Sequence, residues 1–167
     1  MQDCFGWGQP IYSPVSGVAI QAGDGWPERQ PVHFVNDLVL PALDGVATLL
    51  KHALTRDRNR TRDFRYLAGN HLIIETSDAY AFLAHARTGS IRVSAKEAIS
   101  RGQLLAEVGH SGNSAAPHLH FHLMDSVDLQ KAQGIPCCFH EYEVYRDGNW
   151  KAVENGIPKH TERIRKL

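Results

Sequence analysis

Short runs in which apolar and polar residues alternate predict a mainly β fold. Gly8–Gly25 contains β-branched runs broken by glycine and proline, which is typical of small strands joined by tight turns. The same texture returns in Leu72–Thr76 and Ala79–Ala86, which Ser77 and Asp78 separate as a predicted hairpin. Further strands are predicted at Ile91–Val93 and Gln103–Val108. Strands this short, joined by turns, favour antiparallel pairing.

The last forty residues carry a second hairpin signal. Glu141–Tyr145 and Trp150–Val153 flank an Asp-Gly pair within Arg146–Asn149, and Asp-Gly is typical of a tight β-turn. The basic end from Lys159 to Leu167 is predicted to be a surface tail. We therefore expect a C-terminal hairpin extension at about 129–167.

One segment departs from the β pattern and predicts a helical and basic insertion at about 26–65. Apolar residues recur there at helical spacing and predict an amphipathic helix over 42–55: Val46, Leu49, Leu50, Ala53 and Leu54. Residues 56–65 follow with five arginines and little apolar content, which favours a solvated loop over a specific anion site. With this insertion, residues 1–167 are predicted to form a single β domain, because a chain of this length can bury its own core.

Composition narrows the classes of partner. The 18 basic and 18 acidic residues balance, and the sequence pI is about 7.2, so no overall charge favours nucleic acid. No run approaches the roughly 20 apolar residues that span a bilayer. Cys4, Cys137 and Cys138 form no C-x-x-C pair and are expected to be free thiols. Ten histidines remain as the distinctive feature.

Three of these histidines alternate along one predicted strand. His118, His120 and His122 are two residues apart, so they share one face while Leu119, Phe121 and Leu123 share the other. Neutral imidazole is a good ligand for Zn²⁺, so this strand predicts the wall of a metal pocket backed by a core. The alternative is a polar sheet face with histidines placed by chance. The small-residue loop Gly109–Pro117 just upstream favours a site, because it lets a substrate backbone approach.

These residues carry a family resemblance. Gly102–Phe121, with its His-Leu-His strand, resembles the signature of the lysostaphin-type (LytM-like) zinc metallopeptidases, which cut peptide cross-links of bacterial peptidoglycan. The resemblance extends to Gly8–Val18, Gly69–Ile74 and Ala81–His85, roughly 100 residues in all, whereas the insertion and the end beyond Asp128 lie outside it. It implies an antiparallel β-sandwich of the barrel-sandwich hybrid type, with a duplicated hybrid motif.

The resemblance also implies roles for single residues. His120 matches a metal-ligand histidine, and His85 and His118 match the two histidines that flank a metal-bound water. Zn²⁺ would polarise the scissile carbonyl, and a nearby imidazole could accept a proton or stabilise the oxyanion. His122 lies outside the usual pattern and is either a partner of a ligand or a surface residue. For His85 by itself, an ordinary strand histidine is the alternative.

The family takes its other two ligands from an H-x-x-x-D element. His33 and Asp37 form such a spacing, but they follow the first hairpin, whereas the family's element precedes it, so we expect that they are not ligands. Only Met1–Trp7 stand before Gly8, without a histidine, and Asp3 is the candidate there. The N-terminal element that carries these two ligands in the family is then either absent from this sequence or lost.

Three hypotheses follow. The first is a zinc endopeptidase acting on a peptidoglycan peptide, with ligands outside this sequence or from an unexpected place. The second is a metal-free relative that binds peptidoglycan or regulates another hydrolase. The third is a carrier domain of the lipoyl or biotinyl type, which is disfavoured because no lysine stands at a predicted hairpin tip. The resemblance implies the cell envelope or periplasm, although these residues contain no export signal.

Overall fold

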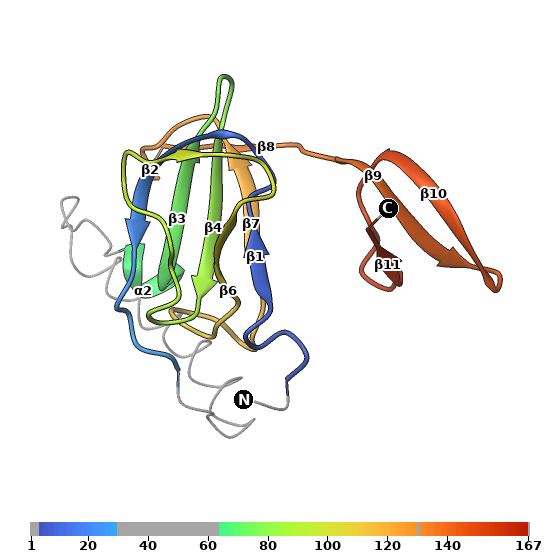
Figure 1. The fold of residues 1–167 in the computed structure, drawn as a ribbon, viewed down its shortest axis with the longest axis horizontal. Helices are drawn as coiled ribbons and strands as arrows, with labels where there is room; N and C mark the ends of the chain where they lie inside the picture. The colour runs from blue at the N-terminus through green and yellow to red at the C-terminus, as the bar shows by residue number, and fades with distance from the viewer. Residues whose placement is uncertain (1–3, 30–63, 130, 167) are drawn as a thin grey trace, which may run out of the picture.

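The computed structural model describes residues 4–29, 64–129 and 131–166, and strands account for nearly all of its regular structure. The largest sheet has six strands in the order β5-β2-β3-β4-β7-β8 (Figure 1), and every neighbouring pair is antiparallel. Its strands are β2 (Gly17–Gly23), β3 (Asn70–Glu75), β4 (Tyr80–Ala86), β5 (Ala98–Ile99), β7 (His120–Met124) and β8 (Gly134–Ile135).

A two-stranded sheet covers one face of this large sheet. It pairs β1 (Pro10–Tyr12) with β6 (Leu104–Glu107). Ile11 and Leu105 from this pair bury their side chains against Leu72 and Leu83 of the large sheet. The two layers enclose the main core, because alternate side chains of each strand point inward. The predicted antiparallel β-sandwich is therefore confirmed.

The opposite face of the large sheet is the one that carries the site. Ile73, Phe82 and Met124 are buried on it, and the short helix α2 (Phe64–Ala68) contributes Ala68. His120 and His122 of β7 lie on this same face, with ring centroids 6.0 and 5.0 Å from that of Phe82. Phe121 and Leu123, which alternate with them, pack against the main core.

A β-bulge interrupts the alternation at the end of β4. Asn70 pairs with Ala86 and His71 with Ala84, so His85 is the extra residue. Its φ of 64° lies in the left-handed region, as is common where one strand of a pair holds an additional residue. Plain alternation would turn His85 to the same side as Leu83, into the main core. The bulge places its side chain with the other histidines instead.

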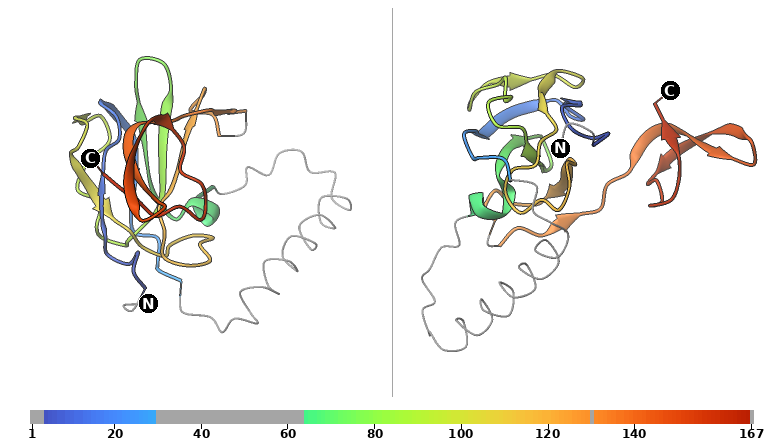
Figure 2. Two further views of the ribbon diagram at one scale, coloured as in Figure 1. Left: turned by 90° about the vertical axis from the view of Figure 1, so that its right-hand side faces the viewer. Right: turned by 90° about the horizontal axis from the view of Figure 1, so that it is seen from below.

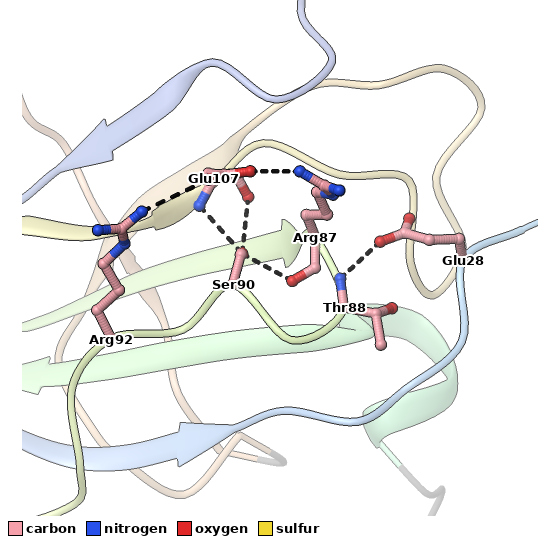
Figure 3. A network of polar contacts seen from close by, with 6 residues as sticks. All are labelled: Glu28, Arg87, Thr88, Ser90, Arg92 and Glu107. Atoms are coloured by element: carbon pink, nitrogen blue, oxygen red, sulfur yellow. Dashed lines mark hydrogen bonds and ion pairs between the residues drawn. The ribbon is translucent and has the colours of Figure 1, made fainter. Parts of the chain in front are cut away.

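The segment after β4 corrects one expectation, because Ile91–Val93 is not a strand. The amide of Arg92 donates to the Leu105 carbonyl (2.8 Å), but the chain turns at Lys96, with φ 74°, before a ladder can extend. Glu107 holds the segment through ion pairs with Arg87 and Arg92 (Figure 3). One backbone bond and these ion pairs therefore stand where a strand ladder was expected.

A separate three-stranded sheet follows β8. It contains β9 (Phe139–Arg146), β10 (Asn149–Gly156) and β11 (Ile164–Arg165), in the order β10-β9-β11. The predicted Asp-Gly turn joins β9 to β10, with positive φ at Asp147 and Gly148. This sheet projects away from the sandwich in Figure 1 and in the right-hand view of Figure 2.

The end of the chain differs from the predicted surface tail, because Ile164 and Arg165 pair with Val144 and Glu143 of β9. Arg165 also forms an ion pair with Glu143, which helps to hold the short strand in register. The predicted helix over 42–55, and most of the predicted insertion, lie outside the described residues. Among the described residues, no helix is long and apolar enough to cross a lipid bilayer.

Candidate functional site

Two glycines allow the site loop, Gly109–Pro117, to cross the start of β3 at very short range. Gly69 and Gly112 have φ of 62° and 68°, and a Cβ on either would lie 2.5 Å or less from backbone atoms of the other segment. Any side chain at these positions would force the two segments apart. The crossing therefore brings the loop against the strands that carry the histidines.

Buried polar groups then lock the loop in place. Asn70 and Ser111 are both fully buried, and the Asn70 amide donates to the Ser111 hydroxyl (3.0 Å), which donates to the Ala86 carbonyl (2.8 Å). The Asn70 side chain accepts from the amide of Trp26 (2.7 Å) and donates to the Trp26 carbonyl (2.9 Å). Because unpaired buried polar groups are costly, this mutual pairing defines one arrangement of the loop.

His85 is held by this loop. It is buried, and its Nδ1 lies 2.9 Å from the Ser111 carbonyl oxygen. A carbonyl can only accept, so Nδ1 carries the hydrogen and Nε2 carries the lone pair. Burial lowers the pKa of His85 to about 4, and the charges of His118, His120 and His110 add to this, whereas the bond to Ser111 opposes it. His85 is therefore neutral near pH 7.

His118 lies between the site loop and β7 rather than in the strand, which corrects the prediction of three histidines on one strand. Strand β7 begins at His120, because residues before it turn to bring the Ala116 carbonyl within 2.7 Å of His118 Nδ1. The ring nevertheless lies beside His85, with centroids 4.8 Å apart. A loop position leaves His118 exposed at the mouth of the site.

His120 and His122 extend the cluster along β7. The His120 ring meets that of His85 edge to face at 5.9 Å, and its Nε2 lies 3.0 Å from Nδ1 of His122. Partial burial lowers the pKa of both rings, and the neighbouring charge of His118 lowers that of His120 further. Two adjacent rings that resist protonation keep lone pairs for a ligand or a proton near neutral pH.

His71 is a member of this face that the sequence did not single out. It pairs across β3 with Ala84, which pairs with His120 across β7, so His71 and His120 stand in one row of the sheet. Its side chain is buried, with Nδ1 2.8 Å from the Gly69 carbonyl oxygen. The alternation of His71 with Leu72 could have indicated which face of the sheet His71 lies on. It could not have indicated which residues of the neighbouring strands stand beside it.

The described residues of the site suit the predicted zinc ion in their chemistry but not in their number. Imidazole chemistry fits, yet the described residues contain no group of three or more His, Cys, Asp or Glu side chains placed to hold a metal. Catalytic zinc sites usually have three protein ligands. The other candidates, Asp3, His33 and Asp37, lie outside the described residues. The described part of the site is therefore not a complete zinc site.

Comparison with known proteins finds a family model that matches part of the chain. Residues 58–133, which include the whole site loop and all four clustered histidines, match the model described as Peptidase family M23. The resemblance seen in the sequence is confirmed. The matched M23 segment covers less than half of the 167 residues, and the first hairpin and the C-terminal sheet lie outside it.

Two solved structures are similar to this M23-like chain. The catalytic domain of the antimicrobial peptidase lysostaphin from Staphylococcus simulans shares 21% identity, with 77% of this chain and 68% of that chain covered and a TM-score of 0.47. A mutant catalytic domain of the prophage-encoded M23 protein EnpA from Enterococcus faecalis shares 18% identity, with 77% and 67% covered and a TM-score of 0.43. At these values the likenesses carry no argument about function. No curated protein matches the chain significantly.

Proposed function

We propose that this M23-like domain is a zinc-dependent endopeptidase that hydrolyses peptide cross-links of bacterial peptidoglycan. The observation that carries the proposal is the convergence of His85, His118 and His120 from a bulge, a loop and a strand, with ring centroids 4.8 and 5.9 Å from His85. Three imidazoles gathered from separate segments are typical of a reaction centre rather than of a chance polar face. The family match supports the reaction class, and the family resemblance supports the substrate.

His85 and His118 suit proton handling. Each directs Nδ1 to a backbone carbonyl, so each presents Nε2 to its surroundings. Because His85 is neutral near pH 7, its Nε2 can accept a hydrogen bond from a water and orient it for attack. His118, at the exposed mouth, is placed to take a proton from that water or to return it to the leaving amine.

His120 is the proposed metal ligand. Its Nε2 is engaged with His122, so Nδ1 is the nitrogen that remains for a metal. Zinc, when bound, would polarise the scissile carbonyl and lower the pKa of its water. We assign its remaining ligands to residues outside the described part, with Asp3 the first candidate. By its place in the family, the domain would act at the cell wall.

The test combines metal analysis with hydrolysis of purified peptidoglycan. The chain should hold zinc in a 1:1 ratio by mass spectrometry, and His120→Ala should lose the metal and the release of new amino groups. His140→Ala, a change to an exposed histidine of β9, should lose neither. A zinc content near zero in protein prepared with excess zinc would contradict the proposal.

A metal-free relative is the second candidate, and the incomplete ligand set among the described residues favours it. Such a protein would bind peptidoglycan or regulate another hydrolase. Sedimentation with insoluble peptidoglycan should then persist in a chelator and in His120→Ala. Binding abolished by the chelator would exclude this candidate and favour the zinc-dependent endopeptidase.

A further inference from the structure

The hydroxyl of Ser114 meets three groups inside the site loop. The side chain is fully buried, and its Oγ donates to the Ala116 carbonyl at 2.7 Å. It also lies 3.0 Å from Nδ1 of His110 and 3.2 Å from Nδ1 of His118. A single buried hydroxyl therefore links two histidines of one loop.

The direction of these bonds follows from the donors available. A carbonyl cannot donate, so the one hydroxyl hydrogen of Ser114 goes to Ala116. The Ser114 oxygen can then only accept, which puts the hydrogen of both His110 and His118 on Nδ1. His118 shares its hydrogen between Ser114 and the Ala116 carbonyl, 2.7 Å away. Both acceptors select the same tautomer, with the lone pair on Nε2.

We propose that Ser114, braced by His110, is a positioning residue that holds His118 in the Nδ1–H tautomer with its ring beside His85. The role of this tautomer in hydrolysis rests on the proposed function, whereas the placement of the ring does not. Ser114 acts through His118, because its hydroxyl is buried behind the loop. Of the three linked residues, His118 is the one that lies at the mouth of the site.

The other end of the linkage is anchored to the wall of the site. His110 is buried, its amide donates to Glu28 Oε2 at 2.7 Å, and its carbonyl accepts from the amide of Arg29 at 2.9 Å. The second oxygen of Glu28 accepts from the amide of Thr88 (Figure 3) at 2.6 Å. Arg29 Nη1 also donates to the Ser114 carbonyl at 2.9 Å. Ser114 is thus held from two sides, which a residue that merely filled space would not require.

The first test reads the tautomer of His118 directly in the full 167-residue chain. Nitrogen chemical shifts of its ring, recorded at about pH 8, above the usual imidazole pKa of ~6.5, distinguish the two neutral tautomers. The shifts should report the Nδ1–H form in the native protein. In Ser114→Ala they should move toward the values of a mixture, because the Ala116 carbonyl alone then holds the hydrogen on Nδ1. Ser77→Ala removes an exposed hydroxyl from the turn between β3 and β4 and should leave them unchanged.

Hydrolysis of a cross-linked muropeptide gives the second readout. Loss of a hydrogen-bond partner of a site histidine typically costs about 10–100-fold in activity, so kcat of Ser114→Ala should fall by about tenfold or more with KM little changed. His110→Phe should lower kcat less, and the double variant should be no worse than Ser114→Ala, because both changes break one linkage. His110→Asn keeps a donor near the position of Nδ1 and should recover most of the loss.

Unchanged His118 shifts in a folded Ser114→Ala protein would overturn the proposal, whatever its activity. If Ser114→Ala does not fold, the shifts in His110→Phe and His110→Asn decide instead: a change in the first that the second reverses supports the linkage, and no change in either refutes it. An inactive chain with the expected shifts would remove the proposed function and leave the positioning intact.

Discussion

The site face of the six-stranded sheet and the C-terminal three-stranded sheet are stabilised in different ways. On the site face, buried polar groups such as Asn70 and Ser111 pair with each other and with backbone. In the C-terminal sheet the side chains that pair are largely exposed. Arg165 lies over the Trp150 ring at 4.3 Å, and Arg163 lies 5.7 Å from the rings of both Tyr145 and Trp150.

The two kinds of contact differ in how firmly they fix the geometry of the side chains. Buried hydrogen bonds are expensive to break because water cannot replace them, so they hold catalytic groups to a single geometry. Exposed ion pairs and cation–π contacts contribute little individually and weaken in salt. The first region suits chemistry that depends on geometry, whereas the second can open locally without disturbing it. Four measurements test this contrast between the two regions.

The largest effect is expected in the main core. Leu105 is fully buried between the two layers, and Leu105→Ala should reduce the free energy of unfolding by about 2–5 kcal/mol, because it leaves a cavity. Leu67→Ala, at an exposed position of α2, should cost much less. Urea denaturation followed by circular dichroism measures both. Equal losses would show that the sandwich is not the stabilising unit.

The second largest effect is expected from acid, which should lower the stability of the fold through His85. The pKa of His85 is lowered to about 4 when folded, against ~6.5 when unfolded, so below pH ~6.5 the unfolded chain binds the additional proton. His85 therefore stabilises the fold fully above that pH, and this contribution decreases as the pH falls toward about 4. The total is at most about 3–4 kcal/mol, because about 2.5 pH units separate the two pKa values at ~1.4 kcal/mol for each unit.

His85→Asn provides the matched control for this pH dependence, because asparagine tolerates a left-handed backbone and does not titrate. Urea midpoints between pH 7 and pH 4 should fall less steeply in His85→Asn than in the native chain. His140→Asn, at an exposed position of β9, should keep the native slope. A native slope in His85→Asn would assign the acid sensitivity elsewhere.

A smaller and local effect is expected in the C-terminal sheet. Trp150→Ala removes the ring that stacks with Tyr145, Arg163 and Arg165, so amides of β9–β11 should lose about 1–2 kcal/mol of protection against hydrogen exchange. Amides of β3 and β4 should keep theirs. Protection lost equally from both would mean that the two sheets unfold together, and the comparison would fail.

The smallest effect concerns salt. Raising the ionic strength from 0.1 to 1 M shortens the Debye length from about 10 to about 3 Å, so the ion pair of the half-exposed Arg146 with Glu162 should weaken slightly. Exchange of the β9 and β11 amides should quicken a little. The Asn70 amide, which donates to a buried hydroxyl, should exchange at the same rate in both solutions.

Alternation and turn chemistry carried most of the fold prediction. The hairpin of β3 and β4 and the Asp-Gly turn after β9 depend on neighbours in sequence, which is why local patterns could indicate them. Ile91–Val93 has strand-like residues, but Arg92 makes one backbone bond to Leu105 and an ion pair with Glu107, and the Ile91 amide donates to the Asp24 carboxylate. The local sequence did not indicate these partners, because they lie in segments that only folding brings together.

The sequence predicted which residues belong to the candidate site better than it predicted how they are arranged. His85, His118 and His120 emerged from strand spacing and a family signature. The bulge at His85 and the start of β7 after His118 did not, because both depend on pairing with distant strands. The alignment of His71 with His120 depends on two strand registers at once. The roles of these residues in catalysis and metal binding remain predictions.

The bulge in β4 has a consequence for how such a domain changes over evolutionary time. His85 is the one residue that the pairing of β3 with β4 does not need, because Ala84 and Ala86 already face His71 and Asn70. Deletion of a single codon would remove this histidine and leave every other pair of the two strands in register. A lineage could therefore lose or regain this member of the site in one step, while the core that encloses Leu72 and Leu83 is inherited unchanged.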